Sequence, residues 1–436
     1  TRELGTTDYG HEGPRLEHIR QLYDVLGKTT DPAVREALLK QIDAVSQSAG
    51  KVAIPNEFDR LLQEIGSTGV NAFTTPDLTV YHNAFPASRL PQWLALYAHR
   101  FEKPVFRLFQ SELEAVYEEK NRSMDGFDPL VDVFLGSFFR HHPYRLQGSV
   151  LGRVEHLKNP SLSEMQRFFD TYYVANNMGL MLAGDIEASE VLPLVEAAFG
   201  GWRSGEVPEF PVYSEPEFDG RQQVTVRMTP VRVAGMGFRT VPEGHPDYAA
   251  LLVCNRLLSN PQEAGLLDNL AREGGVLLTQ AVPVPLHDHG IQLVAYAPRI
   301  LTQSFRGAER KVRAQFEKLK QGKFDDDTLA GVRRSLVNEY RQRFESNQGR
   351  VLAMADVYGR GATWPSFVAF LAELEKVDRA RVSQVAARYF GDNYLMIHSR
   401  AGRSRPTKLD KPGFRPVQPS KANTSKYGES IRNIPS

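Results

Sequence analysis

The sequence is almost without cysteine: Cys254 is the one thiol in 436 residues. A single thiol cannot form an intrachain disulfide, so the fold must depend on its hydrophobic core. Cys254 lies in the apolar run Ala249–Cys254 and is interpreted as a buried small hydrophobic residue rather than as a nucleophile. Thiol catalysis is therefore not expected.

The sequence also lacks an excess of charge of either sign. The 53 basic and 52 acidic side chains give a formal charge of +1, which excludes the strong positive field typical of nucleic-acid partners. No apolar run approaches the roughly 18 residues of a membrane span, and we expect none. Glycine-rich nucleotide loops, a Gly-x-Ser-x-Gly elbow and paired-cysteine motifs are absent, so nucleotide chemistry and serine hydrolysis have no support.

The remaining composition is that of a globular protein, with 41% hydrophobic and 24% charged residues. Apolar residues at helical spacing from Leu16 to Ala49 predict a helical hairpin, and Asn56 is placed at the N-cap of a further helix. Two runs of β-branched and aromatic residues flank Pro76-Asp77 and predict a β-hairpin. Helices are then predicted near 90–100, 111–123, 163–173 and up to 199, with a strand at 178–183.

A proline-rich stretch separates this part from the next, and we expect two domains. The predicted boundaries are 1–206 for the first domain, 207–222 for a linker, 223–400 for the second domain and 401–436 for a tail or connector. The second domain is predicted to contain strands at 223–228, 276–282, 291–296 and 394–399, and helices at 248–258, 305–320 and 327–344.

An internal repeat indicates that the two domains are related. Tyr173 and Tyr389 each follow a helix, precede an Asn by four residues and lead into an apolar run, and their numbers differ by 389 − 173 = 216. The same offset pairs Leu113 with Leu329 inside predicted helices. One offset at two distant places favours duplication.

Two carboxylates could serve a metal. Glu112 and Glu119 are seven residues apart in the run SELEAVYEEK, and this spacing places both on one face of a helix. They could form a ligand and its supporting carboxylate, or an ordinary solvated acidic face. Glu114 and Glu118 are interpreted as surface charges in either case.

The histidine-rich segments are interpreted as loops. Neighbouring residues such as His287, Asp288 and His289 rarely converge on one metal ion. His141-His142-Pro143-Tyr144 is more typical of a turn than of a ligand set, and His11 and His18 lack the i, i+4 pairing of a helical zinc site.

Several motifs together resemble the pitrilysin/insulinase family of zinc metallopeptidases (inverted zincins). They are Asn56–Leu62, Gly69–Thr75, Glu112 to Glu119, His142-Pro143-Tyr144, Tyr172-Tyr173 to Asn177, and Ala183-Gly184-Asp185, in that order, over most of residues 54–200. The resemblance implies an α+β fold of two similar domains, each an antiparallel-rich sheet packed by helices on one side. The second domain resembles the family more weakly and would be non-catalytic.

The resemblance also implies roles for individual residues. Glu119 would be the third zinc ligand and Glu112 the second carboxylate that steadies the site. Asn71, Ala72 and Phe73 would form the edge strand that pairs with an extended peptide substrate. The expected cofactor is zinc, and the expected partners are peptide substrates and the remaining half of the same polypeptide.

One family motif is missing, since no His-x-x-Glu-His occurs in these residues. We interpret the chain as a fragment, most of the N-terminal half of a longer endopeptidase, inactive and poor in zinc by itself. The alternative is a non-catalytic peptide-binding or scaffold subunit of the same fold. A periplasmic or secreted location is expected for such a protein.

Overall fold

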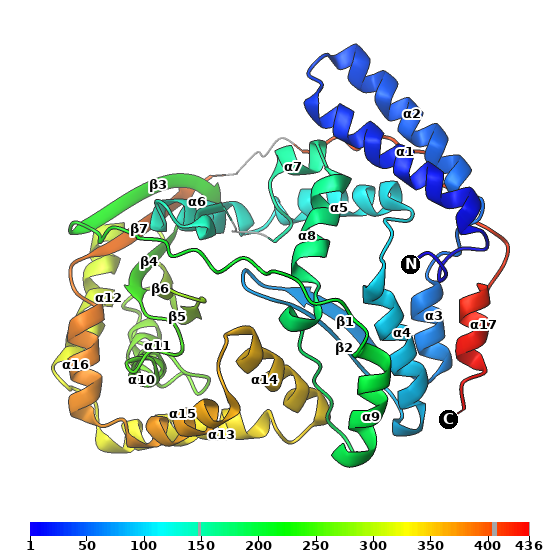
Figure 1. Ribbon diagram of the computed structural model, residues 1–436. Coiled ribbons are helices and arrows are strands. Elements are labelled where there is room, and N and C mark those ends of the chain that lie inside the picture. Colours follow the sequence, from blue (N-terminus) through cyan, green and yellow to red (C-terminus); the bar gives the residue numbers. More distant parts are fainter. Residues whose placement is uncertain (147–149, 403–407, 436) are drawn as a thin grey trace.

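The protein has an α+β architecture, as predicted. The structure, a computed structural model, describes residues 1–146, 150–402 and 408–435. We call the elements from α1 to α9 the first unit and those from β3 to β7 the second unit (Figure 1). The first unit contains α1 (Tyr9–Lys28), α2 (Pro32–Gly50), α3 (Glu57–Glu64), β1 (Thr68–Thr74), β2 (Thr79–Ala84), η1 (Ala87–Arg89), α4 (Leu90–Glu102), α5 (Phe109–Ser123), α6 (Asp128–Phe138), η2 (Pro143–Leu146), α7 (Val154–Lys158), α8 (Leu162–Tyr172), η3 (Ala175–Asn177) and α9 (Ala188–Phe199).

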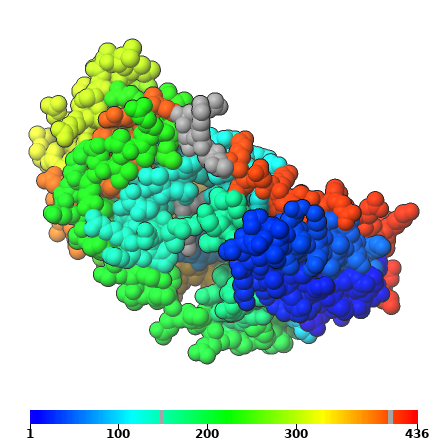
Figure 2. Space-filling model, turned by 90° about the horizontal axis from the view of Figure 1, so that it is seen from above, coloured from blue at the N-terminus to red at the C-terminus, as the bar shows by residue number. Residues whose placement is uncertain are grey.

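The predicted helical hairpin is confirmed in α1 and α2. Asp8 and Asp31 cap the two helices by accepting hydrogen bonds from backbone N–H groups of the first turns, which would otherwise lack partners. Apolar residues of the two helices form a shared core that includes Ile19, Leu26 and Ile42. The hairpin forms one end of the molecule (Figure 2).

The sheet of the first unit is smaller than expected. Strands β1 and β2 form a two-stranded antiparallel sheet, and the predicted strand at Met178–Ala183 is wrong, because the structure shows no strand there. A strand requires a neighbour for its backbone hydrogen bonds, and in the described residues this segment has none. Asn56 does precede α3, but it adopts φ 53° and its side chain makes no capping bond.

The second unit is built around one five-stranded sheet of order β3-β7-β4-β6-β5. Strands β3 and β7 are parallel, and the other neighbouring pairs are antiparallel. The elements are β3 (Arg221–Thr229), β4 (Val233–Thr240), α10 (Tyr248–Leu258), α11 (Leu266–Arg272), β5 (Leu278–Pro285), β6 (Gly290–Ala297), α12 (Phe305–Lys320), α13 (Asp326–Gln342), α14 (Asn347–Gly359), α15 (Trp364–Lys376), α16 (Arg379–Tyr389) and β7 (Tyr394–Ala401).

Alternating residues of this sheet face two different cores. Met236, Phe238 and Met396 pack against the helices of the second unit, as the predicted one-sided packing requires. Leu395 and Ile397 face the opposite side, where they pack with Phe134 and Phe138 of α6. A Cβ added to Gly237 would lie 2.6 Å from the Phe134 ring, so this glycine permits the close approach of α6. The first unit thus covers the open face of the second unit's sheet.

The C-terminal segment, residues 408–435, runs back along the first unit. The Leu409 N–H donates to Asn121 Oδ1 at 2.7 Å, and Arg415 pairs with Asp43 at 2.6 Å. The segment ends in α17 (Lys426–Arg432), where the Tyr427 hydroxyl donates to the carbonyl of Ala95 in α4 at 3.0 Å. The predicted tail is therefore packed against the first unit.

Candidate functional site

Strand β1 has one edge open to solvent. All seven residues, Thr68 to Thr74, are exposed, and the strand pairs with β2 and with no other strand in the part of the chain that the structure describes. The register places Asn71 opposite His82, Ala72 opposite Tyr81 and Phe73 opposite Val80. The three predicted peptide-binding residues therefore lie in succession on the open strand, at the centre of Figure 1.

The register also determines which backbone groups face outward. At the turn, the Thr75 N–H donates to the Leu78 carbonyl at 2.8 Å, so Thr75 and Leu78 are a hydrogen-bonded pair of the antiparallel ladder. Because such pairs alternate along an antiparallel ladder, Phe73 bonds to β2, whereas Ala72 and Thr74 direct their N–H and C=O groups to the open edge. The Ala72 N–H donates a hydrogen bond to the side chain of its neighbour, Asn71 Oδ1, at 2.8 Å.

The base of the hairpin is held by polar and aromatic contacts. Asn83 accepts hydrogen bonds from Trp93 Nε1 at 3.0 Å and from the Tyr97 hydroxyl at 3.1 Å, both on α4. The hydroxyls of Tyr81 and Tyr173 lie 3.0 Å apart, and burial, followed by this contact, raises the pKa of Tyr173. These contacts fix the open strand against the body of the first unit.

The tip of the hairpin is held by the segment after α6. The Tyr144 hydroxyl donates to Asp77 Oδ1 at 2.6 Å, and the His287 N–H contacts the same hydroxyl at 3.3 Å. Burial is the main reason that the pKa of Tyr144 is raised, and the neighbouring Asp77 carboxylate adds to it. Both units therefore contribute to the support of the hairpin tip.

The two predicted metal-site carboxylates lie on α5. Glu112 and Glu119 are both exposed, while Leu113 and Tyr117 bury the opposite side of the helix. The other two carboxylates of α5, Glu114 and Glu118, were expected to be surface charges, and both contact the C-terminal segment. Glu114 accepts the Phe414 N–H at 2.8 Å, and Glu118 pairs with Lys411 at 2.7 Å.

The residues present do not fit a catalytic zinc ion at Glu119. A catalytic zinc needs three protein ligands, and the sequence lacks the histidine motif that would join Glu119. Within the described ranges, three potential ligand side chains converge at one place, namely His142, Asp288 and His289, and neither Glu112 nor Glu119 is among them.

This convergence corrects the interpretation of the two histidine-rich segments. Residues 286–289 do form the turn between β5 and β6, and 143–146 form a 3₁₀ turn, as expected. However, His142 Nε2 lies 3.1 Å from Asp288 Oδ2, and His289 Nδ1 lies 2.8 Å from Asp288 Oδ1. His142 and Asp288 are 146 positions apart, so no spacing in the sequence could have indicated their contact.

The hydrogen bonds of His142 argue against a metal centre here, while His289 Nδ1 and Asp288 Oδ1 are buried without a hydrogen-bond partner among the described residues. His142 Nδ1 accepts the Tyr144 N–H at 3.2 Å, so the ring proton belongs on Nε2, where it is donated to Asp288. A protonated Nε2 has no lone pair for a metal ion. Burial lowers the pKa of His142 and outweighs the opposing effect of Asp288, which keeps the ring neutral.

A second carboxylate holds the same segment in place. Glu215 accepts the backbone N–H groups of Arg140 at 2.8 Å and His141 at 2.6 Å, and that of His142. Burial alone would raise its pKa, but these N–H donors and Arg239 outweigh it and lower the pKa of Glu215 to about 2. The loop 139–142 is thus fixed by a buried anion.

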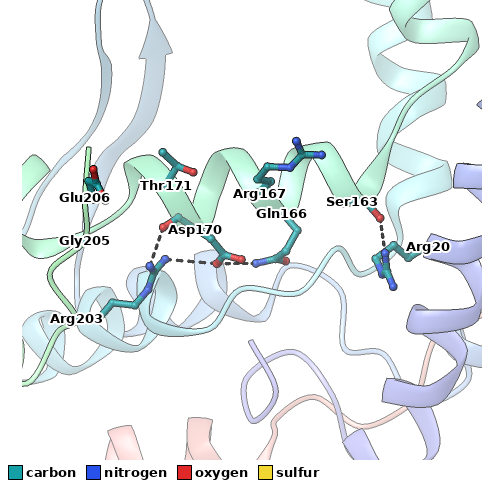
Figure 3. Close-up of a pocket in the computed structure, with 9 residues that line it drawn as sticks. All are labelled: Arg20, Ser163, Gln166, Arg167, Asp170, Thr171, Arg203, Gly205 and Glu206. Carbon is teal, nitrogen blue, oxygen red and sulfur yellow. Dashed lines mark hydrogen bonds and ion pairs between the residues drawn. The ribbon is translucent and has the colours of Figure 1, made fainter. Parts of the chain in front are cut away.

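A polar hollow of about 430 Å³ lies along α8, between Arg20 of α1 and residues 203–206 (Figure 3). Its basic side chains already have partners: Arg20 contacts Ser163, Arg167 pairs with Glu164, and Arg203 donates to the Asp170 carbonyl at 2.7 Å. We assign no function to this hollow, because its three arginines already have partners within the protein.

Comparison with known proteins shows that the chain is similar to peptidases. Residues 161–336 match the family described as "Peptidase M16 inactive domain". The chain is 22% identical to the zinc protease PqqE of Helicobacter pylori (strain ATCC 700392 / 26695) over 374 residues, which cover 79% of this chain and 83% of that protein.

Two solved structures show the same fold. A protease from Helicobacter pylori has a TM-score of 0.72 at 21% identity, covering 80% of this chain and 86% of that one. The periplasmic protease PqqL of Escherichia coli has a TM-score of 0.62 at 14% identity, covering 85% of this chain but 44% of that one. The chain therefore spans most of the first protein and less than half of the second.

Proposed function

Because the chain belongs to the pitrilysin/insulinase (M16) family of peptidases, we propose that it is the peptide-holding part of a zinc-dependent metalloendopeptidase. Strand β1 pairs with an extended peptide, main chain to main chain, through the outward groups of Ala72 and Thr74. Asn71 precedes these two residues and Phe73 lies between them, with its own backbone groups bonded to β2, so of the three residues named from the sequence it is Ala72 that would pair with the peptide. The peptide substrate would have to be unfolded, since a folded protein offers few free backbone groups.

The open edge of β1 is the observation that carries this proposal. An unpaired strand edge exposes N–H and C=O groups that bind another strand unless the protein blocks them. No proline or lysine interrupts residues 68–74, and after a register shift between Thr68 and Asn71 the strand is regular from Asn71 to Thr74. An edge of this length can form several main-chain hydrogen bonds with one peptide.

Peptide cleavage requires parts that these residues do not supply. In the intact protein, zinc would be held by a His-x-x-Glu-His segment together with Glu119, and Glu112 would steady that ligand. The remaining half of the polypeptide would complete the enzyme. This chain alone is proposed to bind peptides without cleaving them, and a periplasmic or secreted location would suit it.

A proline substitution tests the proposed edge directly. Ala72→Pro removes the outward N–H of residue 72 without removing a bond to β2, whereas Ala72→Val keeps it. Binding of a fluorescently labelled, unstructured peptide should weaken tenfold or more in the proline variant and change less than threefold in the valine variant. Equal affinity of both variants would exclude β1 as the binding strand.

The alternative is a non-catalytic peptide-binding or scaffold subunit of the same fold. The match to an "inactive domain" over residues 161–336 is compatible with both possibilities. Assaying the full-length gene product separates the two: chelator-sensitive peptide hydrolysis supports the endopeptidase, and peptide binding without hydrolysis supports the subunit.

A further inference from the structure

A cavity of about 250 Å³ lies at the tip of the β1–β2 hairpin. Four parts of the molecule enclose it: the turn residues 75–78, α6 with the following Tyr144, the β5–β6 hairpin, and the end of α14. Its lining includes Leu78, Leu135, Val284, Leu286 and Ile291, and it is mostly apolar. The cavity therefore lies between the second unit and the hairpin that carries the proposed peptide-binding strand.

The charged groups of this cavity already have partners inside the protein. Arg360 pairs with Asp356 at 2.6 Å and also with Glu243. Asp77 accepts the Tyr144 hydroxyl, as described above. With these charges neutralised locally, the surface left for a ligand is the apolar wall, which favours an apolar group over an ion.

The wall next to β1 is rigid. A Cβ added to Gly359 would lie 2.6 Å from Leu78 Cδ2, so α14 is in close contact with the hairpin turn. Tyr144 holds the other side of the turn through Asp77. A cavity bounded by fixed backbone keeps its shape, and a preformed apolar pocket can discriminate between side chains.

From this arrangement we propose that the cavity is a specificity pocket for one large apolar side chain of a peptide paired with β1. The inference rests on the proposed function. A peptide aligned with residues 71–74 runs on past Thr75 and Pro76, which form the near wall of the cavity. Side chains of an extended peptide alternate between two faces at about 3.3 Å per residue, so a single position reaches the pocket and its two neighbours point away.

The test combines a peptide series with two variants of β5. In the series, each position of one labelled extended peptide is in turn Ala, Leu or Phe, and dissociation constants are measured. Val284→Phe fills the pocket, and Val282→Phe adds the same bulk two residues away on the same strand and face, outside the cavity lining.

The native protein should prefer Leu or Phe over Ala by tenfold or more at one position and not at its neighbours. Val284→Phe should abolish this preference while its affinity for the all-Ala peptide stays within threefold, and Val282→Phe should leave the preference unchanged. A preference that persists in Val284→Phe, or equal affinities at every position, overturns the pocket while the edge-strand proposal stands. Failure of every peptide to bind the native protein overturns both.

A crosslinking experiment keeps the test independent of variant folding. A photoreactive leucine at the preferred peptide position should label residues 75–78, 135 or 284–291 of the native protein. Labelling elsewhere contradicts the pocket.

Discussion

The Tyr144 hydroxyl lies 2.6 Å from Asp77 Oδ1 and donates a hydrogen bond to it, across 67 residues of sequence. This bond connects the segment after α6 with the tip of the hairpin that carries the open strand. Because Tyr144 also contacts the backbone of His287, one side chain links the first unit's hairpin to the second unit's sheet. The orientation of the open strand therefore depends on the contact between the units.

Removing this hydroxyl should loosen the hairpin tip. In Tyr144→Phe the Asp77 carboxylate loses its donor, and hydrogen bonds to charged groups contribute about 1.5–3 kcal/mol. We expect a loss of stability of this order in urea denaturation, with faster hydrogen exchange in residues 73–80. Tyr213→Phe, which alters a neighbouring ring packed on His142, serves as the control. Unchanged exchange in the hairpin would show that the bond does not hold the tip.

A buried ion pair should be a major contributor to the stability of the first unit. Glu12 is 1% exposed at its side chain and receives two hydrogen bonds from Arg107, at 2.6 and 2.7 Å. Arg107→Met would leave the Glu12 charge buried without a partner, at a cost of about 3–5 kcal/mol. Arg415→Met breaks a pair whose arginine is 68% exposed and should cost less than about 1 kcal/mol. Similar melting temperatures for the two variants would contradict this prediction.

Stability should fall at acidic pH partly because of Glu215. Its folded-state pKa of about 2 lies below the unfolded value of about 4.3, so the unfolded chain binds this proton first as the pH falls. The stabilisation is complete above about pH 5 and disappears between roughly pH 4.3 and pH 2. Glu215→Gln should show a flatter decline in this range in urea titrations at successive pH values. Parallel curves for the native protein and the variant would show that another group is responsible.

Zinc analysis of the purified chain should find far less than one ion per molecule. Glu119 is a single potential ligand, and the ring proton of His142 is directed at Asp288, so neither place offers the three ligands of a catalytic site. Glu119→Gln should therefore leave both the zinc content and the background rate of peptide hydrolysis unchanged. Stoichiometric zinc that is lost in this variant would contradict the account.

The second unit could be predicted well because its elements have clear periodicity. Helices α10 and α12 have the predicted bounds, and β7 begins at the predicted Tyr394. Strand β4 and helices α11, α14 and α15 are not among the predicted elements. The run Val233–Thr240 contains two glycines, and one of them, Gly237, is required by the packing of α6 rather than by strand propensity.

The first unit shows where sequence patterns fail. Met178–Ala183 has the composition of a strand, yet composition cannot supply the neighbouring strand that pairing needs. The offset of 216 residues places Leu113 in α5 and Leu329 in α13, but a strand follows Tyr389 and not Tyr173, so the duplication stays a prediction. The contact of His142 with Asp288 depends on the packing of α6 on the sheet, which no local pattern encodes.

Hydrogen exchange at the amide of Ala72 tests the central claim most directly. If an extended peptide adds to β1, saturating peptide should slow exchange at Ala72 and Thr74, whose N–H groups face the open edge, and leave Phe73 nearly unchanged, because its N–H already bonds to β2. Unaltered exchange at Ala72 in the presence of bound peptide would contradict the assignment of β1 as the peptide-binding strand.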